Sequence, residues 1–413
     1  MRETSIAIVG AGIIGASTAL ALQKDGHDVT LFDREGPCAG ASFGNAGAIV
    51  NGSCVPTAMP GIVFDALRML NQPLPPLSIR AAYFPKILPW LFRFVLESRR
   101  SRVSRNATNL HALTSHAVEG WRKLTDNTEL ASLLYDKGWL KVYESERSFN
   151  ATANARQLMD RIGTPYEILS ATEIRDIEPR LAPIFSRGIL QRDCLNIINP
   201  QRMVQGMVDL FVRRGGTYRQ FDARTLDITD REVRLRNSQA VMSADKVVIA
   251  TGAWSRSLAS QVGDNVPLDT ERGYHLMLPM DSVKLLERPV VNGEASFVLS
   301  PMESSLRITS QVELGGLDCE PDYRRVRSLL NVVKRMLPDI DTTEQSVWMG
   351  FRPSLPDSLP ILGFSPNTDR VLYAFGHQHL GMTMGPISGL IIADLVAGRK
   401  PGVDLFPYRA DRF

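Results

Sequence analysis

The chain has 413 residues, of which 44% are hydrophobic and 22% charged, so it is long enough to bury a sizeable core and to form two domains. Its formal net charge of +3 gives no reason to expect nucleic-acid binding, and a small-molecule substrate suits it better. Its cysteines lie far apart, without paired metal-ligand spacing, which indicates reduced thiols in the cytoplasm and neither a disulfide nor a metal site: Cys38, Cys54, Cys194 and Cys319.

The N-terminus carries the pattern of a dinucleotide-binding turn. A β-branched strand is predicted over 5–9, the glycine-rich turn 10–15 follows it directly, and a helix is predicted over 16–24. The first glycine permits a tight bend, the second lets the backbone approach a pyrophosphate, and the third allows close packing of helix on strand. The free N–H groups and dipole of the helix start favour phosphate. The predicted cofactor contacts in this turn are Gly10, Gly12, Ile13, Ile14 and Gly15.

A second strand is predicted over 28–32, and Asp33 stands at its end. An acid at this position hydrogen-bonds a ribose 2′-hydroxyl and would repel a 2′-phosphate, which disfavours NADP despite the neighbouring Arg34. The pattern up to this point is compatible with both FAD and NAD.

Residues 73–102 are rich in proline, aromatic residues and arginine. We expect Pro85 and Pro89 to break this segment before the apolar run 90–96. Two interpretations are open: a membrane-docking element at the lipid interface, or a helix packed on the protein's own core, which we favour. Beyond the apolar N-terminal stretch, no run looks long and uncharged enough to span a bilayer. Three arginines follow the apolar run, at positions Arg99, Arg100 and Arg102.

The rest of the chain alternates between sheet and helix. Short strands over 133–142 and 188–194 suit an antiparallel sheet separate from the nucleotide domain. Asn199 and Pro200 begin a helix that ends at Gly215. The chain begins and ends with strand, glycine loop and helix, so both termini are expected in one domain. Further strands are predicted at 217–221, 231–235, 246–250, 371–375 and within 273–310, and helices at 322–337 and 386–397.

Five ordered motifs resemble those of the D-amino-acid oxidase and glycine oxidase superfamily of flavoproteins, and most closely its bacterial D-amino-acid dehydrogenase branch. They are residues 8–15, 42–47, 250–255, 350–353 with Asp357 and Pro360, and the turn 376–385. The resemblance implies an α/β fold: an FAD-binding Rossmann-like domain of the GR2 type, with a second α+β substrate domain built on a mixed or antiparallel sheet. The expected boundaries are 1–60, 150–185, 199–262 and 350–413 for the FAD-binding domain, and 61–149, 186–198 and 263–349 for the substrate domain.

The resemblance implies that the cofactor is FAD. Small residues over 40–48 would let the backbone pass the ribityl chain and the ring edge. The helix start after the 376–385 turn would face the flavin pyrimidine edge. Relatives with covalent flavin attach it through a C-terminal cysteine, and no cysteine lies beyond Cys319, so the FAD is expected to be non-covalent. The implied contacts beyond the first turn are Asp33, Arg34, Ser42, Asn45, Ala46, Gly47, Thr251, Gly252, Trp254, Gly350, His377, Leu380, Gly381, Met382 and Thr383.

Three residues are expected to act on the substrate. Arg352 matches the family arginine that grips the substrate carboxylate in two parallel hydrogen bonds, and the alternative is an ion pair with Asp357. Tyr274 is expected as a second carboxylate contact, and the alternative is a core tyrosine with a satisfied hydroxyl. His379 lies in the family turn and is expected to contact flavin or substrate, the alternative being a solvated surface loop.

The implied function is oxidation of a D-amino or cyclic imino acid by hydride transfer from Cα to flavin N5, which gives the imino acid. Residues 377–380 and 407–413 look like those of relatives that oxidise hydroxyproline, which favours cis-4-hydroxy-D-proline or D-proline. The expected acceptor is a quinone or respiratory-chain component, and the expected location is the cytoplasm, with peripheral contact to the inner membrane. The alternatives are an oxygen-using oxidase of sarcosine or glycine type, and a non-catalytic flavin-holding subunit of a larger complex.

Overall fold

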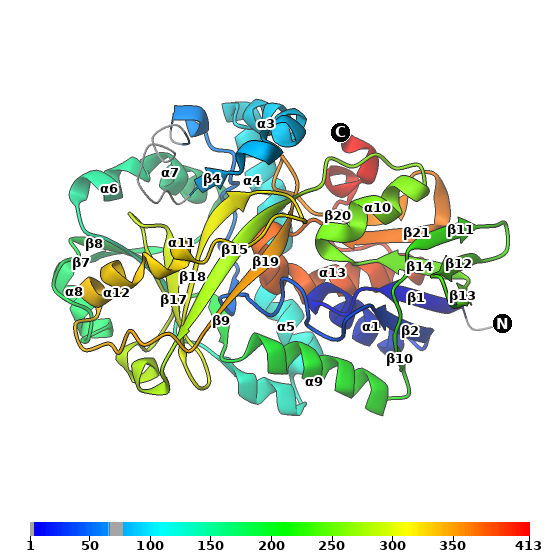
Figure 1. Cartoon of the computed structure of the whole chain (residues 1–413), viewed down its shortest axis with the longest axis horizontal. Helices are drawn as coiled ribbons and strands as arrows, with labels where there is room; N and C mark the ends of the chain where they lie inside the picture. Colours follow the sequence, from blue (N-terminus) through cyan, green and yellow to red (C-terminus); the bar gives the residue numbers. More distant parts are fainter. Residues whose placement is uncertain (1–3, 65, 67–76) are drawn as a thin grey trace.

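Both ends of the chain contribute to a six-stranded sheet, which lies on the right of Figure 1 in this computed structural model. The structure describes residues 4–64, 66 and 77–413. Neighbouring strands are parallel, except that β20 runs antiparallel to β21. In order across the sheet, the strands are β10 (Thr217–Gln220), β2 (Asp28–Asp33), β1 (Ser5–Val9), β14 (Lys246–Ile249), β21 (Thr368–Phe375) and β20 (Ile361–Ser365).

The two faces of this sheet are covered by different elements. In β1, Ile6 and Ile8 pack toward helices, whereas Ala7 and Val9 pack on the other side, because successive side chains of a strand alternate. The first face carries α1 (Ile13–Lys24), α5 (Ala117–Thr125), α9 (Pro200–Arg213) and α13 (Gly381–Val396). The second carries a small antiparallel sheet of β11 (Thr225–Ile228), β12 (Val233–Arg236) and β13 (Val241–Ala244), together with α10 (Ser255–Gln261).

A larger, mostly antiparallel sheet forms the second domain, on the left of Figure 1. One of its faces packs on α8 (Ala171–Ile177), α11 (Arg324–Arg327) and α12 (Leu330–Met336). Both sheets confirm the predicted fold class. In order, the strands are β19 (Ser346–Ser354), β15 (Asp269–Leu278), β18 (Leu306–Leu314), β17 (Phe297–Pro301), β16 (Val290–Asn292), β6 (Trp139–Tyr143), β8 (Arg187–Gln191) and β7 (Glu167–Ser170), with β4 (Leu77–Ile79) paired to β18.

Further helices and a small sheet lie beside the two main sheets. Near the larger sheet lie α4 (Arg100–Thr114), α6 (Glu146–Ala151) and α7 (Ala153–Ile162). A three-stranded sheet links the segment after the glycine turn to the middle of the chain, since β3 (Ala48–Val50) pairs with β9 (Cys194–Ile197), which also pairs with β5 (Leu134–Tyr135). The helix predicted after Asn199 is confirmed, because the Asn199 side chain accepts a hydrogen bond from the Arg202 N–H at 3.0 Å.

Three parts of the predicted domain division are wrong. The prediction places 61–149 in the substrate domain, but α5 within this segment packs with α1 and α13 in the core of the FAD-binding domain. It places 150–185 in the FAD-binding domain, but the strand β7 of that segment pairs antiparallel with β8 in the larger sheet. It also places 350–354 there, but these residues belong to β19, which pairs with β15. In each case a contact with another segment of the chain decides the domain, and no local pattern in the sequence marks that contact.

Two predicted helices also differ from those in the structure. The helix expected over 322–337 divides into α11 and α12, because the Leu329 N–H bonds to the Val326 carbonyl three residues back and tightens the turn. α13 begins at Gly381 rather than at Pro386. Pro386 is tolerated inside it because the carbonyl it leaves free, on Met382, accepts the Trp121 indole N–H at 2.8 Å.

The predicted break at Pro89 does not occur. Helix α3 (Phe84–Glu97) runs through Pro89, with Pro85 in its first turn, where a missing N–H costs nothing. The carbonyl that Pro89 leaves without a partner belongs to Pro85, which is exposed to solvent. The part of the aromatic segment at 73–76 lies outside the described residues.

Among the described residues, one helix is long and apolar enough to cross a membrane, Gln378–Val396, with mean hydropathy 1.3. The sequence interpretation missed it. Since 61% of this stretch is buried and α13 packs against α1, it serves as the core helix of the FAD-binding domain.

Candidate cofactor and substrate site

The glycine turn is packed so closely that side chains do not fit. Gly10 has φ +107°, and a Cβ there would lie 2.4 Å from the Ala250 carbonyl oxygen. A Cβ on Gly15 would lie 1.7 Å from the Gly10 carbonyl oxygen. The turn therefore requires glycine both to bend and to let α1 approach β1.

The start of α1 faces a loop from further along the chain. Gly12 occupies the N-cap position and offers no side-chain cap, and the Ile13 N–H instead donates to Ser42 Oγ at 3.0 Å. A Cβ on Gly12 would lie 3.1 Å from the same oxygen. The side chains of Ile13 and Ile14 are buried, so only their backbone can meet a ligand here.

Asp33 holds the turn in place. Its carboxylate accepts backbone hydrogen bonds from Ala11 at 2.7 Å, Glu35 at 2.9 Å and Gly36 at 3.0 Å. A carboxylate offers about four lone-pair positions, so capacity remains for one more donor such as a ribose hydroxyl. Contact with the ribose stays a prediction.

Four further predicted contacts lie at the ends of β2 and β14. The Arg34 guanidinium lies over the Trp254 ring at 3.9 Å, within the range of a cation–π interaction. Thr251 and Gly252 lie between β14 and this tryptophan, and Gly252 has φ +56°. Ligands of open α/β sheets bind outside the carboxyl ends of the strands, which is where these residues lie.

The loop 42–47 is tied to both domains. Asn45 Oδ1 accepts the Gly47 N–H at 2.8 Å, which fixes the loop internally. The Thr383 hydroxyl, in the first turn of α13, donates to the Ala48 carbonyl at 3.2 Å. Arg307, from β18 of the larger sheet, donates to the Asn45 carbonyl at 2.6 Å.

Arg307 is a residue that the sequence interpretation missed. It also donates to the Phe43 carbonyl at 3.0 Å, and burial lowers its pKa to about 10. The alternation of apolar and polar residues in its strand could have indicated the direction of its side chain. Leu306 and Ile308 face the core of the larger sheet, so Arg307 must face the other domain.

One face of the larger sheet looks toward this loop. In the β15–β19 pair, Glu271 lies opposite Arg352, and His275 lies opposite Trp348. Residues at two-residue spacing share a face, so these side chains all lie on one side. Phe43 contacts the Trp348 ring at 5.4 Å and the His275 ring at 5.6 Å, which shows that this side meets the cofactor loop.

Arg352 is built into this face. Its guanidinium lies over Gly273, where a Cβ would be 2.3 Å from Nη2. Burial lowers the pKa of Arg352, and the negative charge of Glu271 opposes that shift. The alternative ion pair with Asp357 is wrong, because Asp357 pairs with Arg412 at 2.7 Å.

The two histidines of the C-terminal turn differ in environment. The His379 side chain is exposed, yet burial, reinforced by the positive charge of Arg352, lowers its pKa to about 4. The effect of the Arg352 charge shows that the His379 ring lies near that guanidinium. The His377 ring is 2% exposed, and its Nε2 bonds with Ser388 Oγ at 2.9 Å. The ring is thus part of the core, so the prediction that it contacts the cofactor is wrong for the side chain.

Tyr274 adopts the alternative that the sequence left open. Its side chain is 1% exposed and packs on the helix-covered face of the larger sheet. Its hydroxyl donates to Glu313 and accepts the Asp322 N–H at 3.1 Å. A ligand cannot reach this hydroxyl, so the expected second carboxylate contact is not supplied by Tyr274.

The remaining predicted contacts fall into two groups. Those with partly exposed surface are Gly12, Asp33, Arg34, Ser42, Asn45, Ala46, Thr251, Gly252, Trp254 and Gly381. Those that are buried, and can meet a ligand mainly through the backbone, are Gly10, Ile13, Ile14, Gly15, Gly47, Gly350, Leu380, Met382 and Thr383.

The site has features that fit a large polar cofactor. A Cβ on Gly10 or Gly15 would clash with nearby backbone, so the turn stays free of side chains. The N-cap residue of α1, Gly12, has no side chain that could cap the helix N–H groups. On the sheet face opposite it, His275 Nδ1 and Thr309 Oγ1 are buried without a hydrogen-bond partner in the described part of the chain. Buried polar atoms normally have partners, so these two fit a site completed by a bound group.

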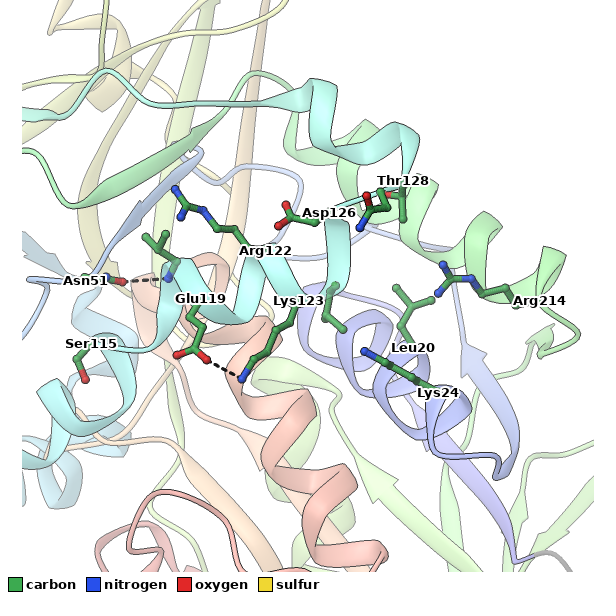
Figure 2. Close-up of a pocket in the computed structure, with 13 residues that line it drawn as sticks. Leu20, Lys24, Asn51, Ser115, Glu119, Arg122, Lys123, Asp126, Thr128 and Arg214 are labelled. Carbon is green, nitrogen blue, oxygen red and sulfur yellow. Dashed lines mark hydrogen bonds and ion pairs between the residues drawn. The ribbon is translucent and has the colours of Figure 1, made fainter.

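A surface groove of about 630 Å³ lies elsewhere, along α1 and α5 (Figure 2). In it, Lys123 pairs with Glu119 at 2.6 Å, and Asn51 Oδ1 accepts the Val118 N–H at 3.0 Å. None of the predicted cofactor or substrate residues lines it. The groove is therefore separate from the predicted cofactor site at the glycine turn.

Comparisons with known proteins agree with this geometry. Residues 5–395 match the family described as FAD dependent oxidoreductase. A D-amino-acid oxidase of Bradyrhizobium diazoefficiens is 32% identical over 99% of this chain and 98% of its own. A D-amino acid dehydrogenase of Vibrio cholerae is 30% identical over 98% of this chain and 98% of its own.

Solved structures share the fold. The glycine oxidase of Geobacillus kaustophilus superposes with a TM-score of 0.76 at 24% identity, covering 100% of both chains. The L-proline dehydrogenase of P. horikoshii superposes with a TM-score of 0.77 at 16% identity, covering 100% of this chain and 98% of its own. At these identities the likeness establishes the architecture alone.

We expect FAD to leave the protein intact on denaturation by acid or heat. Burial raises the pKa of the Cys38 and Cys194 thiols to about 12, and it also raises that of Cys54, so these thiols are poor nucleophiles. Absorbance of the supernatant after precipitation of the protein checks this. Flavin that stays with the precipitated chain would contradict it.

Proposed function

The chain belongs to the family of FAD-dependent oxidoreductases, and from this premise we propose that it oxidises a D-amino acid or a cyclic D-imino acid at the Cα–N bond. The observation that carries the proposal is Arg352, a guanidinium held on the sheet face that meets the cofactor loop. The named activities of its relatives, a D-amino-acid oxidase and D-amino acid dehydrogenases, support the substrate class.

Arg352 suits an amino-acid carboxylate. A guanidinium binds a carboxylate through two parallel hydrogen bonds, and this fixes the Cα–H as well as the charge. Glu271, which lies opposite in the strand pair, limits where the guanidinium can move. His379 is neutral at physiological pH, because its pKa of about 4 lies far below that range, so Arg352 is the cationic partner.

The protein's own contribution is orientation and exclusion of water. When bound, FAD supplies the acceptor for the hydride that leaves Cα. Arg352 holds the carboxylate, and the aromatic cluster of Phe43, His275 and Trp348 walls the same face. The product is the imino acid, which water hydrolyses when it is acyclic.

A cyclic imino acid such as cis-4-hydroxy-D-proline or D-proline is our first choice of substrate. The form of residues 377–380 supports this choice by its resemblance to relatives that oxidise hydroxyproline. The rings of His275 and Trp348 stack with their centroids 5.2 Å apart. Their flat surfaces suit a compact substrate ring beside Arg352.

The test is anaerobic mixing of the yellow protein with single D- and L-amino acids, including both proline compounds, while the flavin absorbance is followed. We expect bleaching with D-substrates, fastest with the cyclic ones. Bleaching by L-amino acids alone would reject the stereochemistry, and bleaching by acyclic D-amino acids alone would reject the cyclic choice. Flavin that no amino acid reduces would favour a non-catalytic, flavin-holding subunit.

We expect a quinone or an artificial dye to support much faster turnover than oxygen. The relatives carry both oxidase and dehydrogenase names, so the acceptor must be measured. Initial rates with the best substrate, in air with and without dye, decide the matter. Equal rates, with one peroxide formed per turnover, would identify an oxidase instead.

A further inference from the structure

Helix α3 covers the edge of the larger sheet with only one of its faces. Ile87 is fully buried and Trp90 is 7% exposed, and both pack with Leu314 at the end of β18. The Trp90 indole N–H donates to the Ser354 carbonyl at 3.3 Å, which fixes the helix two residues from Arg352. The packed-helix interpretation of this segment is therefore confirmed for its inner face.

The outer face of α3 is also apolar. Phe84 is 44% exposed, Leu88 45%, Phe92 67% and Val95 41%. Their spacing of four, four and three residues places them in one stripe along the helix. A helix that packs on the protein through one face only normally carries polar residues on the opposite, solvent-facing side, as amphipathic helices of soluble proteins do.

The same helix and the residues directly after it also carry exposed basic side chains. Lys86 and Arg93 are exposed on the same helix, and Arg99 and Arg100 are exposed directly after it. None of the four makes an ion pair with any residue that the structure describes. The single acid between positions 84 and 100, Glu97, is already engaged by Arg102 and Asn106.

We propose that the outer face of α3 docks the protein on the surface of an anionic phospholipid bilayer. Apolar side chains of Phe84, Leu88, Phe92 and Val95 enter the boundary between headgroups and acyl chains. Lys86, Arg93, Arg99 and Arg100 lie among the anionic headgroups. The charge of this segment favours a lipid partner, because α3 combines an apolar stripe with basic residues that have no ion-pair partner in the described part of the chain, and both features complement an anionic lipid surface.

Docking through α3 would also bring the catalytic strand close to the bilayer. α3 contacts the strand that carries Arg352 through Ser354, and the Tyr83 hydroxyl, just before α3, donates to Asp269 in β15 at 2.9 Å. A lipid-soluble quinone would then be reached without a separate carrier. The docking proposal itself does not depend on which acceptor is used.

The test is co-sedimentation of the holoprotein with vesicles of phosphatidylcholine, with and without phosphatidylglycerol. We expect binding to the anionic vesicles, weakening as salt rises. Leu88→Glu/Phe92→Glu should reduce the bound fraction by about tenfold or more, and Arg93→Gln/Arg99→Gln/Arg100→Gln should abolish the preference for anionic lipid. Flavin content checks that each variant is folded.

The matched control is Val212→Glu/Val241→Glu. It adds the same charge at apolar positions that are 45% and 52% exposed, on α9 and β13, away from α3 in Figure 1. Its vesicle binding should equal that of the unmodified protein. Failure of the unmodified protein to bind anionic vesicles, or equal binding by both double variants, would overturn the proposal. A dimer in gel filtration that Leu88→Glu/Phe92→Glu dissolves would also overturn it, by assigning the stripe to a second copy of the chain.

Discussion

Replacement of Arg352 by lysine should leave FAD bound but lower kcat/KM by about thirtyfold to several thousandfold. Lysine keeps the positive charge but not the planar two-point grip, so the carboxylate is held less firmly and Cα–H moves away from the flavin. Loss of such a contact in a desolvated site costs about 2–5 kcal/mol. Steady-state kinetics on the best substrate, with flavin content measured in parallel, provide the check.

Arg327→Lys is the matched control. Arg327 pairs with Glu344 through two hydrogen bonds of 2.7 and 2.8 Å, but the pair lies on the surface. An exposed pair contributes about 0–1 kcal/mol, so kcat/KM should remain unchanged in this variant. If Arg352→Lys loses less than about fivefold, with normal flavin content, Arg352 does not bind the substrate.

Gly273→Ala tests the same contact without altering Arg352. The new methyl group would lie 2.3 Å from Nη2 of Arg352, and the flexible guanidinium would yield more readily than the strand. We expect a raised KM with full flavin content. Unchanged kinetics would show that the guanidinium does not act from this position.

Replacement of Gly15 by alanine should produce a folded protein with little bound FAD. The added Cβ would lie 1.7 Å from the Gly10 carbonyl oxygen, so α1 and the turn must separate. Overpacking of this kind costs about 1–3 kcal/mol, which corresponds to a rise of about fivefold to 150-fold in the Kd for FAD. The flavin-to-protein absorbance ratio and titration of the apoprotein with FAD measure the effect.

Gly402→Ala provides the comparison. Gly402 is exposed, lies outside the predicted cofactor contacts, and a Cβ there would have no atom within 4 Å. This variant should bind FAD as the unmodified protein does. Equal flavin loss in both variants would mean that the contact at Gly15 is not the cause of the effect.

Local patterns predicted the part of the site that is built from neighbouring residues. The strand, glycine turn and acid at Asp33 lie close in sequence, and each imposes its own constraint on the backbone. The alternation of apolar and polar residues also predicted the strands of the two main sheets. Arg352, which the resemblance indicates as the carboxylate-binding residue, lies on the sheet face that meets the cofactor loop, and its role stays a prediction.

The errors come from contacts between distant segments. Tyr274 and His275 are adjacent, and only the pairing of β15 with β18 and β19 decides which of them faces the cofactor loop. His377 and His379 are likewise separated by one residue, yet the His377 ring packs in the core and the His379 side chain is exposed. Arg307 has no local motif, because its role depends on the Phe43 and Asn45 carbonyls across the domain boundary.

The order of strands in the six-stranded sheet has a consequence for synthesis of the protein. β1 is made first, but its neighbour β14 begins at residue 246, and β21, the next strand, ends at residue 375. β2 is available early, but the apolar segment 5–22 must wait for its other partners, β14 and α13, until most of the protein has left the ribosome. We therefore expect FAD to bind only after α13 has been made, and we expect a chain that stops before α13 to be degraded or to aggregate rather than to persist as an apoprotein.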